Sequence, residues 1–276
     1  MAALRVAYLG PPGTFSEEAA LLCELTAPGA LAPYPTIADA WEAALGGAAD
    51  LALLPAENSL EGSVGATLDL LVHRGGLRIR REVALPVRHQ LLAREGSALG
   101  AITRVVSHPQ ALAQCAGFLR ARLPGAVVEA ASSTAEAARV AAGRDGVAAL
   151  ASRAAAARYG LSVLAADVQD GDDNTTRFVV VGREEEPPTG RDRTSIAFTL
   201  DRDRPGGLHE VLGELAARAI NLSKIESRPT RKALGHYVFF VDFEGHAADP
   251  GAAAALEGVR ARAHALWQLG SYPRAT

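Results

Sequence analysis

The chain has 276 residues, of which 49% are hydrophobic and 21% charged, and its formal net charge is −3. This composition is typical of a globular protein with two domains, and the charge does not favour a nucleic-acid-binding protein. Two cysteines far apart in the sequence and seven scattered histidines predict neither a disulfide framework nor a metal site. The sequence lacks a signal-peptide pattern and a run of about 18 apolar residues, so we expect a cytoplasmic protein without membrane contact.

Strands and helices alternate from the N-terminus. Residues 4–10 are an apolar strand, and Thr14-x-x-Glu17 has the spacing of a capping box at the start of a helix. Thr36-x-x-Asp39 opens the next helix in the same way. The elements that follow are a strand at 50–59, a helix at 63–73 and, at 77–93, an alternating pattern typical of paired strands.

The same alternation continues as far as residue 182. Helices are expected to start at Ser107 and at Ser133, where Ser133-x-x-Glu136 is a second capping box. Repeated βα units predict parallel sheets with helices on both faces, and ligands bind such sheets beyond the carboxyl ends of the strands. The sequence contains neither of the glycine-rich nucleotide-binding motifs, GxGxxG and GxxxxGK[ST]. The expected elements are strands at 103–107, 126–131, 147–152, 161–167 and 177–182, with a helix at 153–160.

Residues 183–193, REEEPPTGRDR, combine many charges with a Pro-Pro pair, which predicts a linker. The linker would divide the chain into a first domain at 1–182 and a second at 194–276. The second domain has the order βαββαβ, which is typical of the ferredoxin-like fold. Its elements are expected at 195–200, 206–219, 221–229, 236–245, 250–264 and 267–273.

Short polar segments stand where the expected strands of the first domain end, and three of them open helices. Helix N-termini offer unpaired N–H groups and a positive dipole end, which suit an anion. For any one segment plain capping is the simpler explanation, but three such segments with one arginine favour a shared pocket. The residues alone predict a two-lobed α/β domain that binds a small anion. The segments lie at 10–16, 57–63, 107–115, 132–134 and 174–178.

These five segments, in this order, resemble the prephenate dehydratase family. The resemblance runs from Val6 to Gly245 and includes VALPVRHQLLA, LSVLAADVQDGDDNTTRF and KIESRP. It implies a bilobed catalytic domain similar to type II periplasmic binding proteins, followed by an ACT domain. It also implies a carbon–oxygen lyase of phenylalanine biosynthesis that converts prephenate into phenylpyruvate, CO₂ and water without a cofactor or metal. Because no helical chorismate mutase segment stands ahead of Val6, we expect the monofunctional form.

The resemblance implies roles for particular residues. Thr176 matches the threonine of the family's TRF motif, so we expect it to donate a hydrogen bond to the departing ring hydroxyl, while Thr175 points the other way. Arg177 suits a substrate carboxylate, and an ion pair with Glu57 is the alternative. Glu57 itself would repel a dianion, which favours a structural role. Further expected site residues are Asn58, Ser107 and Gln114 as polar contacts, and Thr14, Ser16, Ser132, Ser133 and Thr134 as donors to carboxylates. His108 and Cys115 are interpreted as helix-end or packing residues.

The segments DRPGGLHEVL, INLSKIESRP and HYVFFVDFEG resemble the ACT domain of this family, which binds phenylalanine across a subunit interface. We therefore expect allosteric inhibition by L-phenylalanine and a homodimer or homotetramer. An ACT domain used only for dimerisation is the simpler alternative. Gly207 stands where the family more often has alanine, and glycine loosens the loop. The positions carried over are Gly206, Gly207, Leu208, Asn221, Leu222, Glu226 and Ser227.

Other functions stay open on the sequence. Arogenate dehydratase differs only by an amino group on the substrate side chain. A non-catalytic protein that binds a small anion would have a similar fold, but the TRF motif and the lack of an export signal argue against it. A non-catalytic regulator with an ACT sensor is a further alternative, for which the sequence offers neither a helix-turn-helix pattern nor a basic patch.

Overall fold

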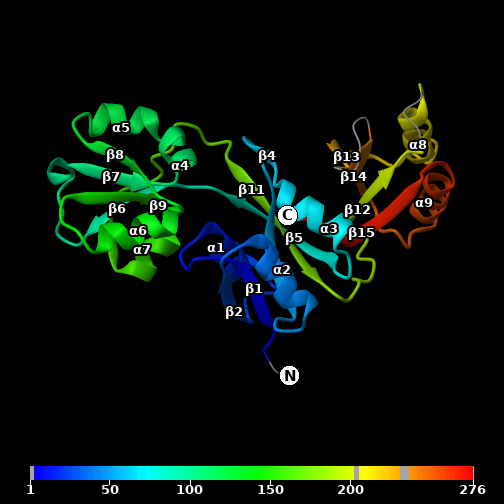
Figure 1. Cartoon of the computed structure of the whole chain (residues 1–276), viewed down its shortest axis with the longest axis horizontal. Coiled ribbons are helices and arrows are strands. Elements are labelled where there is room, and N and C mark those ends of the chain that lie inside the picture. The colour runs from blue at the N-terminus through cyan, green and yellow to red at the C-terminus, as the bar shows by residue number, and fades with distance from the viewer. Residues whose placement is uncertain (1–2, 202–204, 231–235, 276) are drawn as a thin grey trace. The chain divides into compact units, whose positions relative to one another are not determined.

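The computed structural model describes residues 3–201, 205–230 and 236–275. The chain forms two compact units, Met1–Thr67 with Val83–Phe178 and Leu68–Glu82 with Val179–Thr276 (Figure 1). In the described part of the chain, every helix falls short of the length and apolar character that a membrane-spanning helix needs.

The first sheet has the strand order β2-β1-β3-β11-β5, and the short strand β4 pairs with β3. β1 is parallel to both β2 and β3. The run Leu51–Leu54 is buried almost completely, as expected for a strand covered on both faces. The strands are β1 (Arg5–Leu9), β2 (Ala30–Tyr34), β3 (Leu51–Asn58), β4 (Gly62–Ser63), β5 (Arg78–Pro86) and β11 (Thr175–Gly182), with helices α1 (Phe15–Leu22), α2 (Ile37–Leu45) and α3 (Gly65–His73).

The second sheet has the order β10-β6-β9-β7-β8 and two apolar cores, one on each face. Helices α6 (Thr134–Ala142) and α7 (Arg153–Tyr159) cover one face, and α4 (Pro109–Gln114) and α5 (Ala116–Arg122) cover the other (Figure 1). The remaining elements are β6 (Gln90–Arg94), β7 (Arg104–Ser107), β8 (Val127–Ala130), β9 (Val147–Ala151), β10 (Leu161–Ala165) and a short 3₁₀ helix, η1 (Leu99–Ala101). The two-lobed α/β prediction for this part of the chain is confirmed.

Three details of strand pairing differ from the sequence-based expectations. Strand β2 was not expected at all. β5 and β6 are not partners, because they belong to different sheets. The second sheet is mixed, since β6 is antiparallel to both β9 and β10 while β7 is parallel to β8 and β9. Alternation of apolar residues predicts which face a strand buries, but it carries no information about the neighbouring strand.

Helix starts were predicted with mixed success. Thr36 and Ser133 cap α2 and α6 by accepting from the backbone N–H groups of Asp39 and Glu136, as predicted. The prediction of a helix starting at Ser107 was wrong, because α4 begins at Pro109 and its cap is His108, whose ring accepts from the backbone N–H of Gln110.

Thr14 stands at the cap position of α1, but its hydroxyl donates to the carbonyl of Leu9 at 3.1 Å. Glu17 instead accepts from the backbone N–H of Gly13 at 2.6 Å. The predicted capping box, in which Thr14 and Glu17 would each accept from the other's backbone N–H, is therefore wrong. The helix nevertheless starts where it was expected.

The C-terminal sheet has the antiparallel order β13-β14-β12-β15. Helices α8 and α9 pack on one face of it, around a core that includes Ile196, Phe198, Val241 and Phe243. The elements are β12 (Asp192–Thr199), α8 (Gly207–Ala216), β13 (Leu222–Pro229), β14 (Tyr237–Glu244), α9 (Pro250–Arg262) and β15 (Ala265–Pro273). Their order confirms the βαββαβ prediction.

The segment between β11 and β12 has no helix or strand from residue 183 to residue 191. It is nevertheless packed, because Glu186 is 9% exposed and pairs with Arg80 and Arg81, each at 2.6 Å. Burial acts to raise the pKa of Glu186, but the hydrogen bonds from Arg81 and Arg80 outweigh it and hold the pKa below its ordinary value. The segment expected as a linker is thus bound to β5 by ion pairs. The domain boundaries expected at residues 182 and 194 stay a prediction.

The C-terminal strands also pack closely on the N-terminal half of β5. Glu82 accepts from Arg193 at 2.6 Å and from the backbone N–H of Ala275 at 2.9 Å. Gly270 in β15 lies so close to Ile79 that an added Cβ would come within 2.3 Å of its carbonyl oxygen. Removing residues 194–276 would therefore strip partners from β5, so point substitutions test the second domain better than truncation does.

Candidate active site

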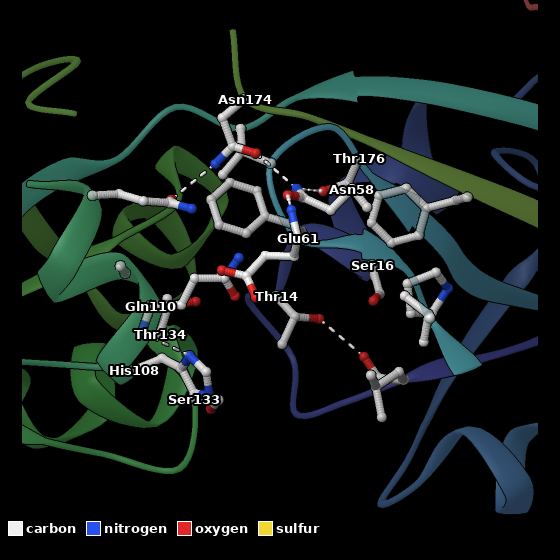
Figure 2. A pocket seen from close by; sticks show the side chains of 18 of the residues that line it. Thr14, Ser16, Asn58, Glu61, His108, Gln110, Ser133, Thr134, Asn174 and Thr176 are labelled. Carbon is white, nitrogen blue, oxygen red and sulfur yellow. Dashed lines mark hydrogen bonds between the residues drawn. The ribbon is translucent and has the colours of Figure 1, made fainter. Parts of the chain in front are cut away.

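A cleft of about 650 Å³ opens in the first unit, at the ends of strands from both sheets (Figure 2). The residues that line it lie at or just after the ends of β1, β3, β7 and β8, and further lining residues lie at the start of β11. This position agrees with the expectation that the ligand binds beyond the carboxyl ends of the strands. The polar lining comprises Thr14, Ser16, Asn58, Glu61, Ser63, His89, His108, Gln110, Gln114, Ser132, Ser133, Thr134, Asn174 and Thr176.

The groups of this cleft that could bind an anion are neutral, and Glu61 is the acidic residue of the described lining. The described lining contains no lysine or arginine side chain. The first turns of α1 and α6 contribute to it instead, at Phe15, Ser16 and Thr134. Ser133 accepts from the backbone N–H of Glu136 at 3.0 Å, a bond that leaves its own hydroxyl proton for another acceptor. Helix N-termini and hydroxyl donors together suit a carboxylate.

Thr176 is held from one side by Asn58. The amide nitrogen of Asn58 donates to the hydroxyl oxygen of Thr176 at 2.9 Å and to Oδ1 of Asn174 at 2.7 Å. Its own Oδ1 accepts from the backbone N–H groups of Leu60 and Glu61 at 3.0 and 3.1 Å. Asn58 has thereby used both donors and both acceptor positions, so it positions Thr176 rather than contacting a ligand. Since Thr176 accepts from Asn58, its O–H is available to donate.

Gln114 is the second fixed amide of the cleft. Its Oε1 accepts from Nδ2 of Asn174 at 2.8 Å and lies 3.1 Å from Nε2 of His89. The cleft thus brings together Thr176, Asn58, Gln114 and the hydroxyl residues expected from the sequence, which are Thr14, Ser16, Ser132, Ser133 and Thr134.

Three expected site residues lie elsewhere. Ser107 is buried in β7, where its hydroxyl donates to the carbonyl of Leu150 at 2.6 Å. Arg177 lies 3.5 Å from Glu57, and neither lines the cleft. Successive side chains of a strand point to opposite faces, so Arg177 lies on the face of Thr175 and away from Thr176. The structure therefore favours the ion pair of Arg177 with Glu57 over a direct contact with substrate.

Other lining residues were not expected from the sequence. Asn174 begins the NTTRF segment, so its place beside Thr176 could have been inferred. His89 stands inside VALPVRHQLLA, a segment that reads as strand and gives no sign of a polar site. His108, interpreted as a helix-end residue, is both the cap of α4 and part of the lining. Cys115 is fully buried, which raises the pKa of its thiol to about 12 and makes it a poor nucleophile.

The positions expected to bind an effector lie in the C-terminal sheet and at the start of α8. Gly206 caps α8 in the left-handed conformation at φ 83°, which glycine adopts without strain. Leu208 and Leu222 both pack against the core under the helices. Ser227 pairs with Phe239, which also packs there, so Ser227 faces the helices.

Glu226 faces the opposite side of the sheet, 3.5 Å from Lys224. A bulge between Leu222 and Lys224 brings Ile225, which is 49% exposed, onto the helix side as well. The backbone carbonyl of Asn221 accepts from Glu244 at 3.0 Å. The structure thus places Leu208, Leu222 and Ser227 on the side of the sheet that the helices cover, and Glu226 on the other side. Gly206 and Gly207 stand at the start of α8. The expected segment DRPGGL includes residues 203 and 204, which lie outside the described residues.

Among the described residues, no three histidine, cysteine, aspartate or glutamate side chains are grouped as metal ligands would be.

Similarity to known proteins identifies the family of this chain. A prephenate dehydratase model matches residues 6–186, and an ACT domain model matches residues 194–261. The chain belongs to the prephenate dehydratase family. The prephenate dehydratase of Mycolicibacterium vanbaalenii is 46% identical over 284 residues, which cover 97% of this chain and 90% of that protein.

Two solved structures share the fold of almost the whole chain. The prephenate dehydratase of Arthrobacter aurescens, solved in complex with L-Phe, has a TM-score of 0.90 and 41% identity and covers 99% of this chain and 90% of its own. A protein described as a novel type of quorum-quenching acylase has a TM-score of 0.89 and 33% identity over 98% of both chains. Proteins described with different activities therefore share this fold, so the reaction must be argued from the site.

Proposed function

We propose that this chain is a prephenate dehydratase that converts prephenate into phenylpyruvate, CO₂ and water and is inhibited by L-phenylalanine. The observation that carries the proposal is the hydroxyl of Thr176, which Asn58 holds as a donor in a cleft lined by helix N-termini. The family match over both domains supports it. The cytoplasmic location expected from the sequence belongs to the same proposal.

Prephenate carries two carboxylates and a ring hydroxyl. The N-terminal turns of α1 and α6, with the hydroxyl of Ser133, offer donors to the carboxylates. The electrons of the breaking bond to the ring carboxylate form a ring double bond as CO₂ leaves. The ring C–O bond breaks as the ring becomes aromatic, and the departing hydroxide takes a proton from solvent to become water. Thr176 stabilises the charge that develops on this oxygen by donating its O–H.

The direct test is to incubate the purified chain with prephenate and, separately, with arogenate. We expect phenylpyruvate from prephenate. Phenylalanine formed efficiently from arogenate, with prephenate left untouched, would establish the alternative dehydratase. Hydrolysis of an acyl amide is the alternative raised by the structural neighbour described as an acylase. It is not favoured, because neither histidine of the cleft contacts a hydroxyl that it could activate in the described residues. The ring of His89 lies against Gln114, and the ring of His108 accepts from the backbone N–H of Gln110.

We expect activity without a metal or an organic cofactor, because aromatisation of the ring drives the reaction. Enzyme treated with EDTA and then desalted should turn over prephenate at an unchanged rate. The control is the same preparation assayed with added Mg²⁺ or Zn²⁺. A rate that returns only with a divalent ion would contradict this expectation.

We further propose that L-phenylalanine binds the C-terminal domain of a homodimer or homotetramer. The relative from Arthrobacter aurescens was solved with L-Phe, and the ACT match covers residues 194–261. The backbone N–H groups at the start of α8, beside Gly206, suit the carboxylate. Leu208, Leu222 and Ile225 offer apolar surface to the ring on the helix side of the sheet.

Replacing Ile225 by asparagine is expected to raise the phenylalanine concentration needed for half-inhibition by about tenfold or more, because apolar contact with the ring is lost. Since Ile225 is 49% exposed, the fold should tolerate the change. Val127→Asn is the matched control, because Val127 is 60% exposed on the edge strand of another sheet. Calorimetry and inhibition assays on both variants measure the effect. Equal inhibition of both variants and the wild type would contradict the proposed site.

A further inference from the structure

His89 lines the cleft from the segment between β5 and β6, and it is 3% exposed. Its backbone N–H donates to Oε1 of Gln169 at 3.0 Å, and its carbonyl accepts from Val168 at 2.9 Å. Its ring packs edge-on against Phe15, with the centroids 5.6 Å apart and the planes at 82°. The ring is therefore held in one place beside Gln114.

A chain of hydrogen bonds leads from Asn58 through Asn174 and Gln114 to His89. Two backbone N–H groups determine which atom donates in each of these bonds. The N–H groups of Leu60 and Glu61 can only donate, so the group they share on Asn58 must be the oxygen Oδ1. The nitrogen of Asn58 then donates to Thr176 and to Oδ1 of Asn174. The nitrogen of Asn174 is left to donate to Oε1 of Gln114.

The state of the His89 ring follows from the same chain of bonds. Because Oε1 of Gln114 is an acceptor, Nε2 of His89 must carry a proton. Nδ1 is buried and has no hydrogen-bond partner among the described residues, so a second proton there would be unsatisfied. Burial also lowers the pKa of His89, although the bond to Gln114 opposes the shift. The ring is therefore neutral, with its proton on Nε2.

We propose that His89, as the neutral Nε2–H tautomer, is a positioning residue that orients the amide of Gln114 in the cleft. Asn174 and His89 together occupy both acceptor positions of Oε1. The NH₂ group of Gln114 is the part that remains for a substrate carboxylate or carbonyl. This role rests on the prephenate dehydratase activity proposed above, but the protonation state of His89 can be measured without any substrate.

The first experiment is a long-range ¹H–¹⁵N NMR spectrum of the full chain labelled with ¹⁵N-histidine, with the His89 signals assigned by their loss in His89→Gln. We expect the pattern of a neutral ring protonated on Nε2 near pH 7. An Nδ1–H tautomer would overturn the proposal, because Nε2 could then not donate to Gln114. This measurement needs only the wild-type fold and one assignment variant.

The second experiment compares His89→Phe with His89→Gln. Phenylalanine keeps the ring against Phe15 but loses the donor, so kcat/KM should fall by about tenfold, the effect of one hydrogen bond. Glutamine can place an amide N–H near the position of Nε2, so it should restore most of this loss. In a Gln114→Leu background, His89→Phe should have almost no further effect, because His89 acts through Gln114.

A purely structural role for His89 gives different results. It predicts equal losses in the two His89 variants and the full additional loss in the Gln114→Leu background, and either result would overturn the proposal. Failure of the proposed function is recognised separately, because the wild-type chain would then leave prephenate unchanged whatever tautomer the spectrum shows.

Discussion

Replacing Thr176 by valine is expected to lower kcat by about 10²–10³-fold, which corresponds to about 3–4 kcal/mol of transition-state stabilisation. The substitution keeps the shape of the side chain and removes the hydroxyl that Asn58 holds at 2.9 Å. That hydroxyl stabilises negative charge which appears on the ring oxygen only as the C–O bond breaks. KM should therefore change little, because the ground state of the substrate loses little binding.

Thr175→Val is the matched control for this experiment. Thr175 is the preceding residue of β11 and its side chain points to the other face of the strand. The same loss of a hydroxyl there should leave kcat close to that of the wild type. Thr176→Ser, which retains the hydroxyl, should recover part of the activity. Steady-state kinetics with prephenate decide the matter, and a Thr176→Val enzyme with normal kcat would remove Thr176 from the mechanism.

Replacing Gly270 by alanine should destabilise the C-terminal unit by about 2–4 kcal/mol. A Cβ at this position would lie 2.3 Å from the carbonyl oxygen and 2.8 Å from the nitrogen of Ile79. Both are backbone atoms of β5, so the contact can be relieved only by moving one strand away from the other. The strain at φ 154° adds to the cost. The denaturation midpoint should fall, and the response to phenylalanine should weaken with it.

Gly213→Ala serves as the control, because a Cβ there meets nothing within 4 Å. Gly213 lies inside α8, where alanine stabilises a helix by about 0.5–1 kcal/mol relative to glycine. Chemical denaturation of both variants therefore separates crowding from a general effect of replacing glycine. A Gly270→Ala protein as stable as the wild type would show that β5 and β15 are not packed as closely as described.

The local pattern of residues was sufficient for much of the fold. Thr36 and Ser133 cap helices because a short side-chain oxygen satisfies the free N–H groups of the first turn. The βαββαβ order and its core followed from apolar spacing, which reflects the side of an element that is buried. The family, too, could be recognised from five polar segments at strand ends, and the match over residues 6–186 confirms it.

Tertiary structure alone decided which hydrogen bonds the cleft residues form and that Ser107, Arg177 and Glu57 lie outside the cleft. The alternation along a strand could have placed Arg177 opposite Thr176, but its pairing with Glu57 depends on the neighbouring strand, β3. His89 reaches Gln114 across 25 residues, and Asn58 reaches Thr176 across 118. Sequence patterns report local conformation and burial, whereas these hydrogen bonds depend on the pairing of distant segments. That pairing carries no local signature, because it results from the packing of the whole unit.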